Sequence, residues 1–224
     1  ANQTVSVTTT DDDVAGFTIV ESDGSTSVDE SGTTDTFTIV LDAQPNSDVV
    51  ISISSDDTGE ATVTSTLTFT SANWDTAQTV TITGADDFIL DGNQSSTVTV
   101  TVVDSISDND FSGVADQTVS VTTTDDDAAG FTIVQSEATT EVAELGTTDI
   151  FTVVLDAEPT SDVALTISSD DTGEATVTST LTFTSANWDT PQTITITGVD
   201  DDLIDGDIVS TVTVVVDDAN SDDD

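Results

Sequence analysis

The sequence has no lysine, arginine or histidine, so none of its 45 acidic side chains can pair with a basic side chain. The formal charge at pH 7 is −45 over 224 residues. Self-repulsion of this size opposes compaction. The carboxylates can be stabilised only by water, backbone N–H groups, protons or bound metal ions. We therefore expect a fold that is marginally stable without cations.

Other absences exclude whole classes of function. Without Lys or Arg the chain cannot neutralise phosphates, which argues against nucleic acids and anionic membrane surfaces as partners. No apolar run approaches the length of a transmembrane helix. Paired carboxylates can hydrolyse glycosides, but this chain has no His, Cys, Lys or Tyr, and its acids occur in duplicated clusters. We expect neither an enzyme nor a small-molecule substrate.

The hydrophobic residues make up 35% of the chain and alternate with Thr and Ser. Period-2 alternation is typical of half-buried β-strands, and no helical periodicity is visible. Seven strands separated by Asp/Gly/Asn/Ser-rich turns predict an all-β, immunoglobulin-like sandwich, with Trp74 covering one end of its core. The predicted strands are Phe17–Val20, Thr36–Leu41, Val49–Ser54, Thr66–Thr70, Thr79–Thr83, Thr97–Val103 and Thr118–Thr124.

The chain repeats itself with a shift of 114 residues. The run from Ser54 to Thr76 recurs unchanged from Ser168 to Thr190, and the segment that begins at Val5 returns at Val119. Each unit is large enough to be a domain, so the pattern indicates tandem sandwiches joined head to tail. We expect a final strand of a preceding module, or a donor strand, at 1–10, acidic linkers at 11–13 and 125–127, one module at 14–124, and a second at 128–224 that lacks its last strand.

The acids cluster at one end of the predicted sandwich. If each strand reverses direction, three loops and the segment after the last strand meet at one pole, where the next module begins. In the first module these segments carry Asp29, Glu30, Asp56, Asp57, Glu60, Asp86, Asp87, Asp91, Asp125, Asp126 and Asp127. In the second they carry Glu144, Asp170, Asp171, Asp200, Asp201, Asp202 and Asp205, and the acids Asp11, Asp12 and Asp13 would come from another copy. A thinner cluster at the opposite pole holds Asp104, Asp108 and Asp110.

Calcium is the metal ion that best suits a group of acidic loops at one end of the sandwich. It takes six to eight oxygen ligands in flexible geometry, whereas Mg²⁺ keeps more water and transition metals prefer His or Cys. We expect several Ca²⁺ ions at the junctions, which would stiffen when the ions bind. Scattered acids such as Asp42, Asp48 and Asp156 are instead expected to be solvated surface.

Three motifs resemble the Calx-beta domain family. The segment Thr122–Thr132, with its three consecutive acids, resembles the end of one Calx-beta domain running into the next. Gly84–Gly92 and Gly198–Gly206 resemble that family's acidic loop, and Val28–Gly32 and Val142–Gly146 resemble the loop with a ligand glutamate. The resemblance covers essentially the whole chain. It implies calcium ligands at Glu30, Asp86, Asp87, Asp91 and Asp125 to Asp127, with counterparts at Glu144, Asp200, Asp201, Asp205 and Asp11 to Asp13.

These observations favour a structural subunit of an extracellular or cell-surface filament or stalk, of the kind built from bacterial surface repeats. Its partners would be other copies of the same chain. Residues 1–10 could complete the second module of a neighbouring copy by strand addition; equally, the sequence could be a window of one long covalent tandem. The alternatives from other classes are a fragment of a tandem-repeat adhesin and a calcium-binding sensor module.

Overall fold

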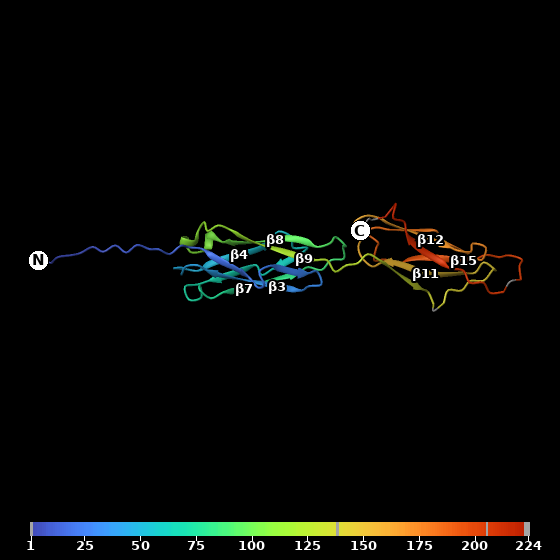
Figure 1. Ribbon diagram of the computed structural model, residues 1–224, viewed down its shortest axis with the longest axis horizontal. Helices are drawn as coiled ribbons and strands as arrows, with labels where there is room; N and C mark the ends of the chain where they lie inside the picture. Colours follow the sequence, from blue (N-terminus) through green and yellow to red (C-terminus); the bar gives the residue numbers. More distant parts are fainter. Residues whose placement is uncertain (1, 138, 205, 222–224) are drawn as a thin grey trace. The chain divides into compact units, whose positions relative to one another are not determined.

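The computed structural model describes residues 2–137, 139–204 and 206–221, which form two compact units made of β-strands (Figure 1). Unit 1 holds strands β1 to β9 and unit 2 holds strands β10 to β16. The described residues include no α-helix, only two 3-10 turns, η1 (Asp104–Ile106) and η2 (Asn109–Phe111). The expected all-β class is confirmed.

Unit 1 is a sandwich of two sheets. The four-stranded sheet has the order β1-β3-β7-β5, with β1 at Phe17–Glu21, β3 at Thr34–Leu41, β7 at Gln78–Gly84 and β5 at Ala61–Val63. The five-stranded sheet has the order β2-β9-β8-β4-β6, with β2 at Thr26–Asp29, β9 at Gln117–Thr124, β8 at Gln94–Val102, β4 at Val49–Ser55 and β6 at Thr66–Phe69. Every pair of neighbouring strands is antiparallel except β2 and β9, which run parallel.

The core of unit 1 follows from the alternation in the sequence. Along β8 the side chains of Val98, Val100 and Val102 point into the sandwich, while the threonines between them are only partly buried. Phe37 on β3 and Phe69 on β6 are fully buried. Trp74 is partly buried and packs against the same core, as expected from its place in the turn. Burial of apolar surface on this scale, at roughly 25 cal/mol per Å², is the main favourable contribution to folding.

Unit 1 contains nine strands where the sequence predicts seven. All seven predicted strands are present within two or three residues of their expected ends. The two additional strands, β2 and β5, have four and three residues, too few to show an alternation. β2 also depends on β9, a partner distant in the sequence, so no local pattern predicts it.

Unit 2 repeats one sheet of unit 1 and only part of the other. Its four-stranded sheet has the order β10-β11-β15-β13, with β10 at Phe131–Gln135, β11 at Thr148–Leu155, β15 at Gln192–Gly198 and β13 at Ala175–Val177. Its second sheet has the order β14-β12-β16, with β14 at Thr180–Phe183, β12 at Val163–Ser169 and β16 at Val212–Val216. Among the described residues, unit 2 therefore has no strand in the places of β2 and β9.

The acids at the pole with η1 and η2 hold a loop in place. Asp108 is 4% exposed, and its carboxylate accepts hydrogen bonds from the backbone N–H groups of Asp110 (3.0 Å) and Ser47 (2.6 Å). These bonds keep the pKa of Asp108 below its ordinary value of 3.8, against the opposing effect of burial. Asp108 therefore joins the loop before β9 to the loop before β4, which gives this acid a structural role.

We predict that Asp108→Asn lowers the unfolding midpoint of unit 1 by several degrees at pH 7, because the amide turns one acceptor into a donor that faces an N–H group. The matched control is Asp110→Asn, which removes the same charge from an exposed side chain. A carboxylate with a lowered pKa stabilises the fold above its unfolded-state pKa and loses that effect as the pH falls through its folded-state pKa. The gap between the two variants should thus shrink below about pH 3.8. Equal midpoints at pH 7 in thermal melts would contradict this role.

Candidate metal centre

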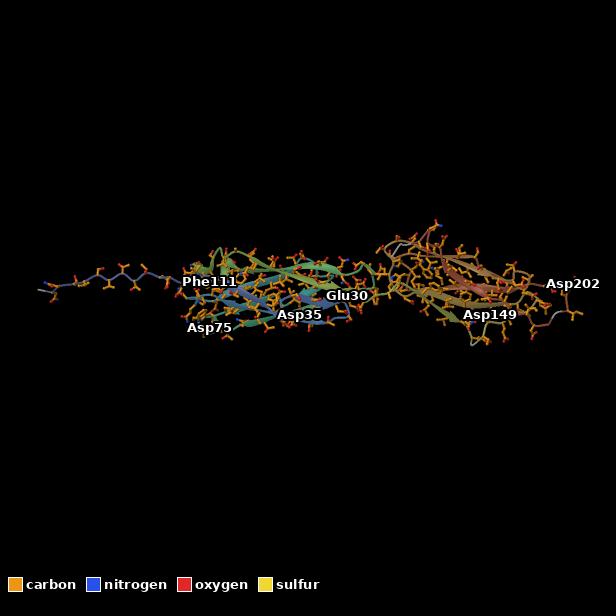
Figure 2. All side chains as sticks on the ribbon, in the orientation of Figure 1. Glu30, Asp35, Asp75, Phe111, Asp149 and Asp202 are labelled. Carbon is orange, nitrogen blue, oxygen red and sulfur yellow. The ribbon has the colours of Figure 1, made fainter. Side chains whose placement is uncertain are left out.

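Three carboxylates from different loops of the sequence come together near the end of β9. Glu30, Asp87 and Asp127 each offer an oxygen, and these oxygens lie within 4.8 Å of one another. Glu30 directly follows β2, Asp87 comes three residues after β7, and Asp127 comes three residues after β9. In unit 1, Glu30 lies at the opposite end from Phe111 and Asp75 (Figure 2). The expected convergence of three acidic segments on one pole is therefore present.

Backbone contacts fix the position of Glu30. Its N–H group donates to the carbonyl oxygen of Thr124, the last residue of β9 (3.1 Å). The neighbouring Asp29 carboxylate accepts hydrogen bonds from the Ser31 hydroxyl, the Ser31 N–H group and the Thr124 hydroxyl, which lower the pKa of Asp29. Asp29 thus closes the turn and leaves Glu30 to face the other two acids. Thr124 is a positioning residue that the sequence does not reveal, because one more threonine at a strand end gives no distinctive signal.

Gly84 brings the loop after β7 close to the loop after β2. A Cβ atom at this position would collide with the carbonyl group of Asp29, and one at Gly198 would collide with that of Ala143. The loop between β4 and β5 joins the same pole, since the carbonyl oxygen of Glu60 accepts from the Ala85 N–H group (2.8 Å) and from the Thr123 hydroxyl (3.4 Å). Glycine is required here by space, because any side chain would push the Glu30 and Asp87 loops apart.

The electrostatics of the cluster call for a positive charge. Glu30 is 1% exposed and Asp87 and Asp127 are half-buried, so water screens them poorly. Two unit charges about 4 Å apart repel each other by roughly 4 kcal/mol at an effective dielectric constant of about 20. The chain has no side-chain cation to offset this repulsion. A proton or a bound cation would offset it, and a set of carboxylate oxygens suits Ca²⁺ or Mg²⁺.

The other expected ligands of the first module lie outside this cluster. Asp57 accepts a hydrogen bond from the Gly59 N–H group in its own loop (3.0 Å), and Asp86 and Asp126 are exposed. Of the expected set, the described residues within mutual reach are Glu30, Asp87 and Asp127, while those outside the cluster are Asp57, Asp86, Asp91, Asp125 and Asp126.

In the second unit the corresponding acids are not assembled within the described part of the chain. Asp171 accepts from the Gly173 N–H group in its own loop (3.0 Å), as Asp57 does from Gly59. Asp205 lies outside the described residues. The remaining expected ligands, namely Glu144, Asp200, Asp201, Asp11, Asp12 and Asp13, belong to no cluster of three acids. In unit 1 the third carboxylate of the cluster follows β9, and no strand occupies that place among the described residues of unit 2.

Comparison with known proteins gives structural likeness only. No protein-family model matches the chain, and no curated protein matches it. Among solved structures, the calcium-binding unit CBD12 from CALX1.2 is 14% identical, covers 88% of this chain and 79% of its own, and has a TM-score of 0.36. Domains 5–6 of the S-layer protein SbsC are 19% identical over 91% of each chain, with a TM-score of 0.33. The YadV chaperone is 9% identical over 89% of this chain and 99% of its own, with a TM-score of 0.37. Likeness at this level carries no argument about function.

The described part of the chain has no helix that is both long and apolar enough to cross a membrane.

We predict that Gly84→Ala destabilises unit 1 by about 1–3 kcal/mol, the usual cost of forcing an extra carbon into a filled site. The control is Gly59→Ala, whose Cβ would meet only the side chain of Asp57, at 3.2 Å. Denaturant unfolding in the presence of a chelator measures both variants. If the two alanines cost the same, the close approach at Gly84 does not hold the pole together.

Proposed function

We propose that the chain is a structural subunit of an extracellular, calcium-stabilised filament or stalk. The observation that carries this proposal is the group formed by Glu30, Asp87 and Asp127 in a chain without basic side chains. Such a group is costly unless a cation occupies it, and a cation present outside cells at millimolar concentration meets that need. A bacterial surface would supply this environment, and the repeated modules would supply the length.

The chemistry of the ligands favours calcium. The group consists only of carboxylates on loops. Ca²⁺ accepts such sets with variable geometry, whereas Mg²⁺ requires near-ideal octahedral coordination and gives up its water reluctantly. Several ions per chain follow if each junction holds one or more, with Glu144 and Asp201 contributing at the second module.

A bound ion would connect the two layers of unit 1. Asp87 follows β7, which belongs to the four-stranded sheet, whereas Glu30 and Asp127 follow strands of the five-stranded sheet. One ion bound by all three therefore joins both sheets and the segment that leaves the module. Modules of extracellular proteins bind Ca²⁺ with dissociation constants of about 0.1–1 mM. An ion at 100 times its dissociation constant adds about 2.7 kcal/mol, a large part of the roughly 5–15 kcal/mol that stabilises a domain.

A structural role explains the repetition better than the two alternatives do. The run Ser54–Thr76 is identical in Ser168–Thr190, and the strand registers agree, for example Phe17 opposite Leu41 and Phe131 opposite Leu155. An adhesin fragment would be expected to carry a site in one module only, and a sensor would be expected to use its modules differently. Closely similar modules suit a repeated building block whose partners are further copies of itself.

We predict opposite effects of Glu30→Gln with and without calcium. In excess chelator the variant should unfold at a higher temperature than the wild type, because one of three mutually repelling charges is gone. In millimolar calcium the wild type should gain stability and the variant should gain much less. The control is Asp23→Asn, which removes one exposed charge that does not belong to the cluster.

Differential scanning calorimetry at constant ionic strength measures these effects, with magnesium in place of calcium as a second control. A wild-type midpoint that is the same in calcium and in chelator would refute the calcium proposal. So would equal calcium responses of Glu30→Gln and the wild type.

A further inference from the structure

Unit 2 contains an open groove of about 1240 Å³ at the edge of its three-stranded sheet, with an apolar floor and polar and acidic residues, among them Glu141, Glu144 and Asp200, also in its lining. The residues that line it include Ile133, Val142, Phe151, Ile196, Val212 and Val214. Shifted by 114 residues, these become Ile19, Val28, Phe37, Ile82, Val98 and Val100, which are core residues of unit 1 or pack against that core. The groove is therefore a core position that unit 2 leaves open.

In unit 1 the same position is filled by β9. This strand lies between β8, with which it pairs antiparallel, and β2, with which it pairs parallel. Its side chains Val119 and Val121 point inward and are 4% and 0% exposed. Ser120 and Thr122 point outward and are exposed. A strand with two valines on one face thus completes the core.

A second copy of that strand exists at the start of the sequence. Residues 3–10 have the same eight amino acids as Gln117–Thr124. They belong to no strand, and Val5 and Val7 are 89% and 82% exposed (Figure 1). Among the described residues no strand fills this groove, while residues 3–10 match the filling strand of unit 1 and hold their valines in water.

We propose that residues 3–10 of one copy fill the groove in unit 2 of a second copy. This inference rests on the proposed filament and names the contact that would build it. The register follows from unit 1: Val5 would lie opposite Val212 and Val7 opposite Ser210, as Val119 lies opposite Val98 and Val121 opposite Ser96. The 140–143 segment would pair with the donor strand on its other side, as β2 does with β9. Main-chain hydrogen bonds on both edges would provide affinity, and the two valines would provide fit.

In the same register, the donated segment would also contribute a carboxylate to the metal site of unit 2. Asp13 follows the donor strand as Asp127 follows β9, so it would reach Glu144 and Asp201, the counterparts of Glu30 and Asp87. A calcium site of unit 2 would then be formed by two copies, and calcium would tighten the contact. Donor and acceptor are different surfaces of the chain, so the contact is head-to-tail and produces chains of copies where it does not close into a ring.

The first experiment measures the mass of the 224-residue chain in solution by light scattering. In calcium the wild type should form a ladder of multiples of 23.0 kDa. The double variant Val5→Asp/Val7→Asp should remain monomeric, because it places charges on the apolar floor of the groove. The control Ser6→Asp/Thr8→Asp adds the same charges to the outward face and should still form the ladder. A monomeric wild type, or a ladder from the valine variant, would overturn the proposal.

The second experiment fixes the register with disulfides, which the natural chain lacks. Ser6→Cys/Thr211→Cys places the thiols on directly opposite residues, as Ser120 and Thr97 are in unit 1. Directly opposite Cβ atoms lie about 4.5–5.5 Å apart, and diagonal ones lie further. The control Ser6→Cys/Thr213→Cys is out of register by two residues and should cross-link poorly. A covalent ladder from the first variant alone on denaturing gels supports the register, whereas a cross-linked monomer would show insertion within one copy and overturn it.

The two proposals fail in different ways. Assembly that is equal in calcium and in chelator would leave strand donation intact and remove the calcium joint. A calcium-dependent unfolding midpoint in a chain that remains monomeric would leave the calcium site intact and remove strand donation.

Discussion

The repulsion among acids that have no basic partner is the constraint on which the rest of the structure depends. In most proteins a buried carboxylate can be paired with Lys or Arg, but this chain has neither. Two substitutes remain, the N–H and O–H donors of the fold itself and a cation from outside. Beyond the acids that are simply solvated, the structure shows examples of both solutions.

Acids of the first kind are stabilised by hydrogen bonds from N–H and O–H groups of the protein itself. Asp35 is an example: burial raises its pKa, but hydrogen bonds from Ser27, Ser22 and Thr36 outweigh that effect and lower it. Asp149 keeps a lowered pKa in unit 2 through the equivalent contacts with Ser136, Glu141 and Ile150. These carboxylates stabilise loops at neutral pH with no ion. The acids of the second kind, represented by Glu30, lie within reach of other carboxylates, so a bound cation would lower the repulsion among them.

Much of the fold could be predicted from the sequence because alternation is a local property. Thr and Val in period 2 locate β8 and β9 closely. The pole was also predictable, since strand reversal alone places the segments of Glu30, Asp87 and Asp127 together. Which acid of each loop takes part in the cluster could not be predicted. Asp57 accepts a hydrogen bond within its own loop, and Asp86 is exposed and outside the cluster although its neighbour Asp87 belongs to it; both outcomes depend on loop conformation rather than on residue type. The short strand β2 was missed for a related reason, since it exists only through its contact with β9.

The parallel pairing of β2 and β9 has a mechanical consequence. Tension along the chain would pull unit 1 through the segment before β1 and the segment after β9. Because β2 and β9 run in the same direction, such a pull slides one strand along the other and loads their hydrogen bonds together. An antiparallel pair pulled from one end would instead open one bond at a time. The parallel pairing of β2 and β9 therefore makes unit 1 more resistant to a pull along the chain than an antiparallel pairing would.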